Sequence, residues 1–151
     1  MFSGDRAKLQ TDFSVGSGNA LQACIATILD IELNETPNFI ADPAGYMASL
    51  HTFLHSRGYT FLKLATPGNK LPVAGSWGAL CVAAGGSPRG EHKHVVVAQV
   101  DCEDGRTLRC IHDPHPDGRG ITEHQESWAG FIVPLDVSMM GPVAAAVAES
   151  N

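Results

Sequence analysis

The chain has 151 residues, of which 44% are hydrophobic and 17% charged, and its formal net charge is -6 at pH 7. This length can bury one core but is too short for two ordinary domains, so we expect a single domain over residues 1–140 and a tail or short helix over residues 141–151. The Lys and Arg residues are scattered singly, which argues against a nucleic-acid partner.

The first predicted element is an amphipathic helix over about residues 20–30. Its apolar positions follow the i, i+3, i+4, i+7, i+8 spacing of one helix face, and they are Leu21, Cys24, Ile25, Ile28 and Leu29. Asn19 precedes them and is the expected N-cap. Residue 20 is therefore expected in the first turn.

A second helix is predicted to begin at Asp42-Pro43, a capping residue followed by proline at the first helical position, and to end at Gly58. Its apolar stripe consists of Tyr46, Met47, Leu50, Phe53 and Leu54. This helix carries no evident chemistry.

After Gly58 the pattern changes to short runs rich in β-branched and aromatic residues, separated by Gly, Pro, Asn and Asp. Strands are expected at residues 59–65, 77–84, 94–100, 107–112 and 128–134, and exposed loops at 67–72 and 85–90. Helices followed by strands predict an α+β fold with a mostly antiparallel sheet of about five strands. The Ala-rich segment after Pro142 is expected to fray or to form a short helix.

No stretch of the sequence approaches the roughly 20 apolar residues of a membrane helix, and the first residues lack the apolar core of a signal peptide. We therefore expect a cytoplasmic protein without a membrane partner. The four cysteines show no CxxC spacing and lie mostly in apolar or strand-like segments, which predicts reduced, buried thiols.

Asp104-Gly105 is a strong turn signal between two of the predicted strands. If the two strands pair outward from this turn, His94 lies at the start of the first strand and Asp113 at the end of the second. The residue opposite His94 is then within one or two positions of Asp113. The sequence therefore predicts that His94 and Asp113 are neighbours in space.

An imidazole beside a carboxylate is the base and orienting acid of a nucleophilic triad. A cysteine at the start of the first helix would complete it, because the helix N-terminus and a nearby imidazolium both lower a thiol pKa. That position holds Ala20. Either the chain is an inactive relative of a cysteine hydrolase, or a cysteine has been replaced by alanine.

Several short segments, in order along most of the chain, carry a family resemblance. They are Gln10-Thr11, the run from Gly18 to Leu29, Pro37-Asn38-Phe39, Ser87-Pro88-Arg89-Gly90, His94-Val95-Val96, His112-Asp113-Pro114-His115-Pro116 and Gly130-Phe131-Ile132-Val133-Pro134. These segments resemble small phage and bacterial proteins with a papain-like, bacteriocin-peptidase-like (C39-like) fold. In that family the first helix opens with Gly-Asn/Asp-Cys, and the cysteine aligns with Ala20.

The resemblance implies that His94 and Asp113 are the family's histidine and acid. Similarity to papain-like enzymes generally implies that Gln10 donates to the oxyanion hole, although its spacing to position 20 is longer than in papain. The implied activity is acyl transfer through a thioester, without a cofactor, from a peptide, isopeptide or other amide to water or an amine. The implied setting is a bacterial host cytoplasm, with a host or defence protein as substrate.

The origin of Ala20 has two interpretations. A natural pseudoenzyme has no reason to keep the histidine, the acid and the helix start together, whereas a single engineered Cys→Ala leaves them all in place. If Ala20 is natural, the leading alternative is a non-catalytic module that binds a peptide or protein in the cleft. Cys24 lies one turn inside the helix on the apolar stripe, so we expect it in the core and not as the nucleophile.

The histidines allow a further interpretation, a metal hydrolase. His92 and His94 form an HxH pair, and further zinc ligands could come from His112, Asp113, His115 and His124. For substrate binding we expect Asn19 and a group of rim residues, namely Trp77, Arg89, His92, His115, Arg119 and Trp128. The acidic net charge favours a neutral or basic partner. Nothing in the sequence indicates an oligomeric state.

Overall fold

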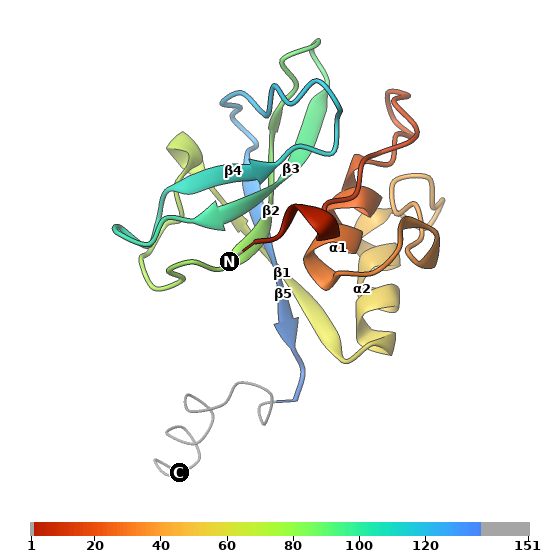
Figure 1. Cartoon of the computed structure of the whole chain (residues 1–151), viewed down its shortest axis with the longest axis horizontal. Helices are drawn as coiled ribbons and strands as arrows, with labels where there is room; N and C mark the ends of the chain where they lie inside the picture. Colours follow the sequence, from red (N-terminus) through yellow and green to blue (C-terminus); the bar gives the residue numbers. More distant parts are fainter. Residues whose placement is uncertain (1, 137–151) are drawn as a thin grey trace.

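The structure, a computed structural model, describes residues 2–136. Two helices, α1 (Ala20–Leu29) and α2 (Tyr46–Ser56), lie on one side of a five-stranded sheet (Figure 1). The strands are β1 (Tyr59–Ala65), β2 (Leu80–Gly86), β3 (Lys93–Val100), β4 (Leu108–His112) and β5 (Trp128–Pro134). All neighbours pair antiparallel in the order β1-β5-β2-β3-β4, which confirms the predicted α+β class. The predicted C-terminal tail or helix lies outside the described residues.

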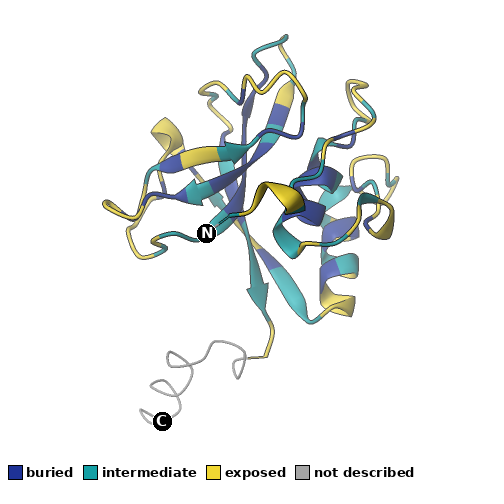
Figure 2. Cartoon of the chain, in the orientation of Figure 1, coloured by how far each residue is buried: buried dark blue, intermediate teal, exposed yellow. Residues whose placement is uncertain are grey.

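The sheet is buried on both faces at its centre. On the helix side, Val82 and Val97 pack against α1 and α2, whereas their neighbours Ala83 and Val96 face a second apolar cluster on the other side. Leu71, from the segment between β1 and β2, closes this second cluster. Figure 2 shows that the buried positions follow the middle strands and the inner faces of the helices. The period-2 alternation of strand residues thus divides the core into two layers.

Helix α1 matches the predicted range because its ends are well specified. It is buried from Ala23 to Thr27, and its small residues Ala23 and Ala26 are fully buried, as close packing of a helix on a sheet requires. Asp30 ends the helix in the left-handed region, with φ of 56°. The Arg6 guanidinium donates to the carbonyls of Thr27 and Ile28 in the last turn, which satisfies acceptors that the helix itself leaves free.

The start of α2 differs from the prediction. The Asp42 side chain accepts from the backbone N–H of Ala44 at 2.9 Å, and the Asp42 carbonyl accepts from Gly45 N–H at 3.0 Å. These bonds form a turn, and the helix begins only at Tyr46, after Gly45 at φ of 95°. The predicted end is confirmed, because α2 ends at Ser56 and Gly58 follows with φ of 84°.

Strand β2 is shifted toward the C-terminus relative to the prediction. Gly78, at φ of 75°, turns the chain, so the strand begins at Leu80 and not at residue 77. Gly85 and Gly86, predicted to lie in an exposed loop, are buried and pair with His94 and Lys93 of β3. A side chain at Gly85 would lie 2.5 Å from a backbone carbonyl, so the glycine permits close contact between chains.

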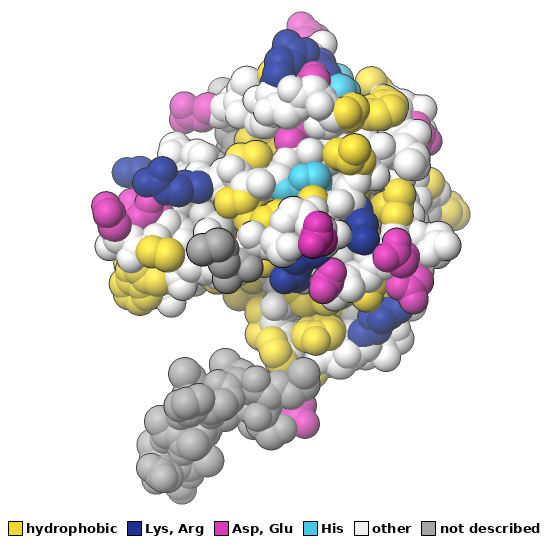
Figure 3. Space-filling view, in the orientation of Figure 1, with side chains coloured by type: hydrophobic (Ala, Val, Ile, Leu, Met, Phe, Trp, Pro, Cys, Tyr) yellow, Lys and Arg dark blue, Asp and Glu magenta, His cyan; other side chains and the backbone are white. Residues whose placement is uncertain are grey.

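Charges are mixed on the exterior. On the face shown in Figure 3, basic side chains are interspersed with acidic ones and with apolar patches. Three large apolar side chains stay exposed on two loops near the start of α1, namely Phe13, Val15 and Ile40. Within residues 2–136, no helix combines the length and apolar character needed to cross a membrane.

Candidate functional site

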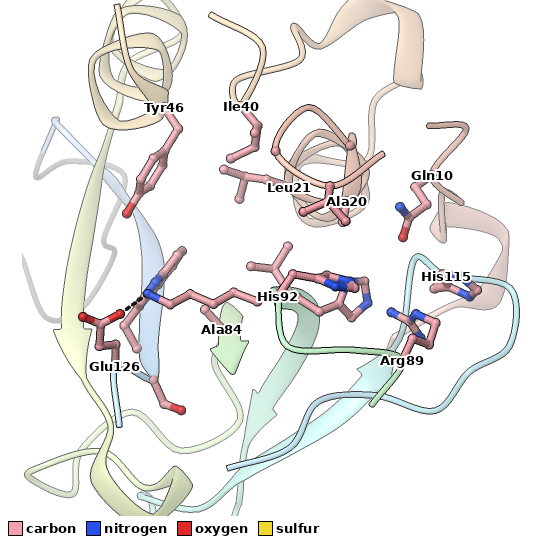
Figure 4. A pocket seen from close by; sticks show the side chains of 18 of the residues that line it. Gln10, Ala20, Leu21, Ile40, Tyr46, Ala84, Arg89, His92, His115 and Glu126 are labelled. Carbon is pink, nitrogen blue, oxygen red and sulfur yellow. Dashed lines mark hydrogen bonds and ion pairs between the residues drawn. The ribbon is translucent and has the colours of Figure 1, made fainter. Parts of the chain in front are cut away.

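A cleft of about 1050 Å³ lies between the start of α1 and the sheet. Its walls come from the loop before α1, from α1 itself, from α2, and from the facing ends of β1, β2, β3 and β5. Figure 4 shows Ala20 and Leu21 of α1 on one side, with Gln10, His115 and Arg89 grouped at one end and Tyr46 and Glu126 at the other. Gln10, Ala20 and His94 all line this cleft, which therefore contains three of the four predicted catalytic positions.

Ala20 is the first residue of α1. Asn19, at the N-cap position, forms no side-chain hydrogen bond to the first turn of this helix. The N–H groups at a helix start carry partial positive charge, and a group at position 20 lies next to them. The cleft wall at this position therefore favours an anion, whether a thiolate or a carbonyl oxygen that gains negative charge during a reaction.

His94 and Asp113 form a buried pair. His94 Nε2 lies 2.7 Å from Asp113 Oδ1, and the two side chains are 5% and 3% exposed. The carboxylate accepts two further bonds, from the backbone N–H of His115 to Oδ1 at 2.9 Å and from that of Gly120 to Oδ2 at 2.7 Å. Asp113 is thus held in place, and because its carboxylate accepts from Nε2, it stabilises the imidazole tautomer with the proton on Nε2. Nδ1 is the ring nitrogen left for a group in the cleft.

The β3–β4 hairpin brings this pair together, as the sequence predicts. Its register pairs Val97 with His112, with an irregularity between Val97 and Ala98. Asp113 follows the last residue of β4 and so lies beside the first residues of β3. The predicted proximity of His94 and Asp113 is confirmed.

The surroundings of His94 favour its neutral form. Burial lowers the pKa of the imidazole below its usual value, and the charges of Arg89 and His115 act in the same direction. The hydrogen bond and charge of Asp113 oppose this effect and raise the pKa. A neutral ring with its proton on Nε2 can accept a proton at Nδ1, as a general base must.

Asn19 has a different role from the one predicted. Its Oδ1 accepts from the backbone N–H groups of Thr11 and Asp12, both at 2.8 Å, and its Nδ2 donates to Thr11 Oγ1 at 2.9 Å. The side chain is 4% exposed and does not line the cleft. Asn19 therefore occupies the N-cap position without a side-chain capping bond, and it fixes the segment that carries Gln10 against the helix start.

Gln10 lines the cleft, but its amide is only half satisfied. Its Nε2 donates to the Asp12 carbonyl at 3.0 Å, whereas Oε1 is buried and has no hydrogen-bond partner among the described residues. The backbone N–H of Gln10 donates to the Pro114 carbonyl at 2.9 Å, which ties this segment to the chain next to Asp113. One N–H of Nε2 and both lone pairs of Oε1 thus have no partner among the described residues.

Of the other predicted rim residues, four line the cleft: Arg89, His92, His115 and Trp128. The His115 ring lies 5.0 Å from that of Phe13 and 6.4 Å from that of His94. Trp77 was wrongly placed, because it packs on Gly105 in the β3–β4 turn, at the opposite end of the hairpin from His94. Arg119 lines a separate pocket of about 300 Å³.

The cysteines support the choice of position 20 over Cys24. Cys24 is fully buried in the core, where burial raises the pKa of its thiol well above the usual value. Cys81 is also buried, and burial raises its pKa to about 12. Cys102 and Cys110 are exposed, contrary to the expectation of buried thiols, and all four cysteines are unpaired.

The histidines proposed as zinc ligands are dispersed. His112 Nε2 lies 2.7 Å from the Lys8 carbonyl, and His124 Nδ1 accepts from the backbone N–H of Glu126. Over residues 2–136, no three His, Cys, Asp or Glu side chains come close enough together to hold a metal ion. Nothing in this arrangement favours the metal-hydrolase interpretation.

Sequence reasoning missed part of the cleft wall. Lys63 and Tyr46 come from β1 and α2, two elements that carried no chemical signal, and Glu126 from the turn before β5. The alternation of β1 could have indicated that Lys63 points away from the core. Its partners could not be read from the chain, because they are distant in sequence.

Comparisons of the chain with protein-family models, with curated proteins and with solved structures found no match. The interpretation of the cleft therefore depends on its own geometry. Its main features are a helix start at Ala20, the buried His94–Asp113 pair and the half-satisfied amide of Gln10.

Proposed function

We propose that this fold is the scaffold of a papain-like cysteine hydrolase, whose active form carries a cysteine where Ala20 now stands. The observation that carries the proposal is the buried His94–Asp113 pair in the cleft that the first residue of α1 also lines. In this proposal His94 is the general base and acid, and Asp113 orients it. The chain with Ala20 keeps these groups but lacks the nucleophile.

Two features of the site would activate a thiol at position 20. The uncapped start of α1 stabilises negative charge, and His94 can take the thiol proton at Nδ1 while Asp113 stabilises the resulting imidazolium. Both effects lower the thiol pKa, so the resting site would hold a thiolate and an imidazolium.

The reaction then proceeds in two acyl transfers. The thiolate attacks the carbonyl carbon of the scissile amide, and the carbonyl oxygen takes the negative charge. The C–N bond breaks as the imidazolium of His94 gives its proton to the leaving amine, which leaves a thioester. Water loses a proton to His94 and attacks the thioester, and the carboxylic acid departs as the C–S bond breaks, which restores the thiolate and the imidazolium. An amine in place of water would give transfer to a new amide.

The negative oxygen would lie at the start of α1. The backbone N–H of residue 20 is one donor, and the N–H of Gln10 Nε2 that is not bonded to Asp12 is the second. Asn19 supports this arrangement indirectly, because its bonds to Thr11 and Asp12 hold the segment that carries Gln10. By the family resemblance, the substrate is a peptide or isopeptide of a host or defence protein in the bacterial cytoplasm.

The test is alkylation of the Ala20→Cys variant with iodoacetamide at pH 6, with mass-spectrometric mapping of the labelled residue. Ala48→Cys is the matched control, because it places a thiol at an exposed position of α2. We expect the thiol at position 20 to react at least about tenfold faster than the control, and to lose this advantage when His94→Ala is added. Equal rates in the two single variants would contradict the proposal.

A second candidate function follows from Ala20 itself. If the natural gene encodes alanine at this position, the cleft would bind a peptide or protein without cleaving it. The sequence of the natural gene at codon 20 separates the two functions. A cysteine codon supports the hydrolase, and an alanine codon supports the binding module.

A further inference from the structure

The charge of the cleft is opposite to that of the whole chain. The protein has 16 Asp and Glu residues against 10 Lys and Arg, yet among the described residues Glu126 is the one acidic side chain that lines the cleft. Three basic side chains line it, namely Lys63, Lys93 and Arg89, and of these Arg89 pairs with Asp117 outside the lining at 2.9 Å. Positive charge gathered in a cleft of an acidic protein attracts an anionic ligand and raises its rate of association.

Lys63 and Lys93 lie at the end of the cleft that Tyr46 and Trp128 line. Lys63 Nζ donates to the Tyr46 hydroxyl at 2.6 Å and lies 4.8 Å from the centre of the Trp128 ring. Within residues 2–136 Lys63 forms no ion pair, and Lys93 pairs with Glu126. One carboxylate thus faces two ammonium groups, and one positive charge stays uncompensated. Hydrogen bonding and cation–π contact already orient Lys63 for a ligand.

At the other end of the cleft, one buried acceptor has no hydrogen-bond donor among the described residues. Gln10 is 8% exposed, and its Oε1 is a buried acceptor without a partner among the described residues. Leaving such a group unpaired costs free energy, so a ligand that supplies an N–H there gains affinity. Figure 4 shows Gln10 near Ala20, His115 and Arg89, across the cleft from Tyr46 and Glu126. The main chain of a peptide carries N–H groups at regular spacing and suits this acceptor.

The size and rim of the cleft also suit a peptide. Its volume of about 1050 Å³ lies just above the range for small-molecule pockets, about 300–1000 Å³. Phe13, Val15 and Ile40 are exposed, and all three line the cleft. Exposed apolar side chains at the mouth of a cleft are typical of surfaces that bind a protein segment.

We propose that the cleft binds an acidic peptide, with a main-chain N–H on Gln10 Oε1 and an Asp or Glu side chain between Lys63 and Lys93. This proposal deepens the proposed function and rests on it for the interpretation of the cleft as a substrate site. The net charge of the chain favours a neutral or basic partner, whereas the charge of the cleft favours an acidic one. The charge of the cleft decides, because the lysines are the charges nearest to a ligand bound there.

Fluorescence anisotropy tests the proposal on the protein with Ala20, which binds without turnover. The probes are fluorescein-labelled heptapeptide pools with uncharged, cysteine-free flanks and Glu, Gln or Lys fixed at each position in turn. We expect the Glu pool to bind about tenfold more tightly than the Gln pool at one or two positions, and the Lys pool most weakly. Higher salt should reduce this preference.

Four variants separate the contributions. Lys63→Gln and Lys93→Gln should reduce the preference for Glu over Gln to less than about threefold, whereas Lys63→Arg should retain it. Lys70→Gln, which changes an exposed lysine outside the cleft, should leave it unchanged. Gln10→Met should weaken all pools by a common factor and leave the preference for Glu intact, because it removes the acceptor of a main-chain N–H.

Three results would overturn the proposal: equal binding of the Glu and Gln pools, no binding of any pool, or competition by free glutarate as potent as that of the best peptide. The last result would indicate a small anion as the occupant. Failure here is distinct from failure of the proposed function. An activated thiol in Ala20→Cys without a preference for Glu would refute only the acidic peptide, and a preference for Glu with an ordinary thiol would refute only the hydrolase.

Discussion

At the level of single residues, Asp113 determines what His94 can do. The carboxylate accepts from His94 Nε2 and from two backbone N–H groups, so it cannot rotate away without leaving buried donors unpaired. It also raises the pKa of His94 against the lowering effect of burial. The tautomer and the basicity of His94 therefore both depend on one side chain.

The titration of His94 gives the first prediction. Burial lowers the pKa of His94, so its imidazole resonance should titrate below pH 6.5 in an NMR experiment on the protein with Ala20. Asp113→Asn should lower this pKa further, and Arg89→Gln should raise it. The His94 contribution to stability is then present above about pH 6.5 and is lost as the pH falls toward the pKa of the folded state. A His94 titration midpoint above pH 6.5 in the unsubstituted chain would show that burial is not the main influence on the pKa of His94.

Asn19 gives a second prediction at this scale. Serine is a good helix N-cap, so Asn19→Ser would preserve stability if the asparagine served the helix. Because Asn19 instead binds Thr11 and Asp12, we expect Asn19→Ser to lower the free energy of unfolding by about 2–3 kcal/mol. Urea denaturation measures this loss. A change smaller than about 0.5 kcal/mol would show that the side chain acts as a cap after all.

The sequence predicted some of the site residues and missed others for one physical reason. His94 and Asp113 are linked by a short hairpin, whose turn residues Asp104-Gly105 specify the pairing. The roles of Asn19 and Trp77 depend on partners in other segments, for which no local pattern exists. The sequence predicts the role of a residue when its partners lie close along the chain, as across a short hairpin.

At the level of elements, the cleft depends on close packing between strands. Gly130 in β5 lies between Lys63 of β1 and Val82 of β2 in the register of the sheet. The ring of Phe61, which is 5% exposed, occupies the space above it, and a Cβ at Gly130 would lie 1.9 Å from a ring atom. Glycine is required at position 130 because a side chain there would overlap the Phe61 ring, and not because the backbone adopts an unusual φ angle.

Gly130→Ala should therefore destabilise the fold by overpacking, by about 1–3 kcal/mol. Gly4→Ala is the matched control, because a Cβ there meets no atom within 4 Å. Adding Phe61→Leu to Gly130→Ala should recover part of the loss, since it removes the obstructing ring atoms. Thermal unfolding measures all three. A Gly130→Ala protein as stable as Gly4→Ala would contradict this packing.

The same distinction between local and distant determinants explains the element boundaries. Strands β1 and β5 match their predicted ranges because turn residues flank alternating apolar runs on both sides. The prediction for β2 failed because glycine usually ends a strand, whereas Gly85 and Gly86 continue this one beside the segment that contains Thr122. The start of α2 was predicted too early because Asp42-Pro43 also suits a turn.

At the level of the whole molecule, the cleft lies where the helix layer meets the facing strand ends, and residues distant in sequence meet there. Gln10, Ala20, His94 and Trp128 come from four separate segments and line one cavity. The lining of the cleft is basic, whereas the net charge of the chain is acidic, so the composition of the chain does not predict the electrostatic potential in the cleft. Composition limits the class of protein, and the fold determines the character of the site.

The thiols of the folded molecule give a prediction at this scale. A thiol reagent should modify Cys102 and Cys110 in the native protein, and Cys24 and Cys81 only after denaturation, because the latter two are buried. Burial and the charge of Asp113 raise the pKa of Cys110, so its reaction should require alkaline pH. Mass spectrometry of native and denatured samples measures this pattern. Native labelling of Cys24 would contradict its place in the core.

The most direct test of the proposed triad is the ultraviolet titration of the thiolate in Ala20→Cys, measured as the difference from the chain with Ala20. We predict that the new thiol ionises well below the usual value of about 8.5, and that His94→Ala in the same background shifts the transition back upward. A transition at or above the usual value, unaffected by His94→Ala, would contradict the triad.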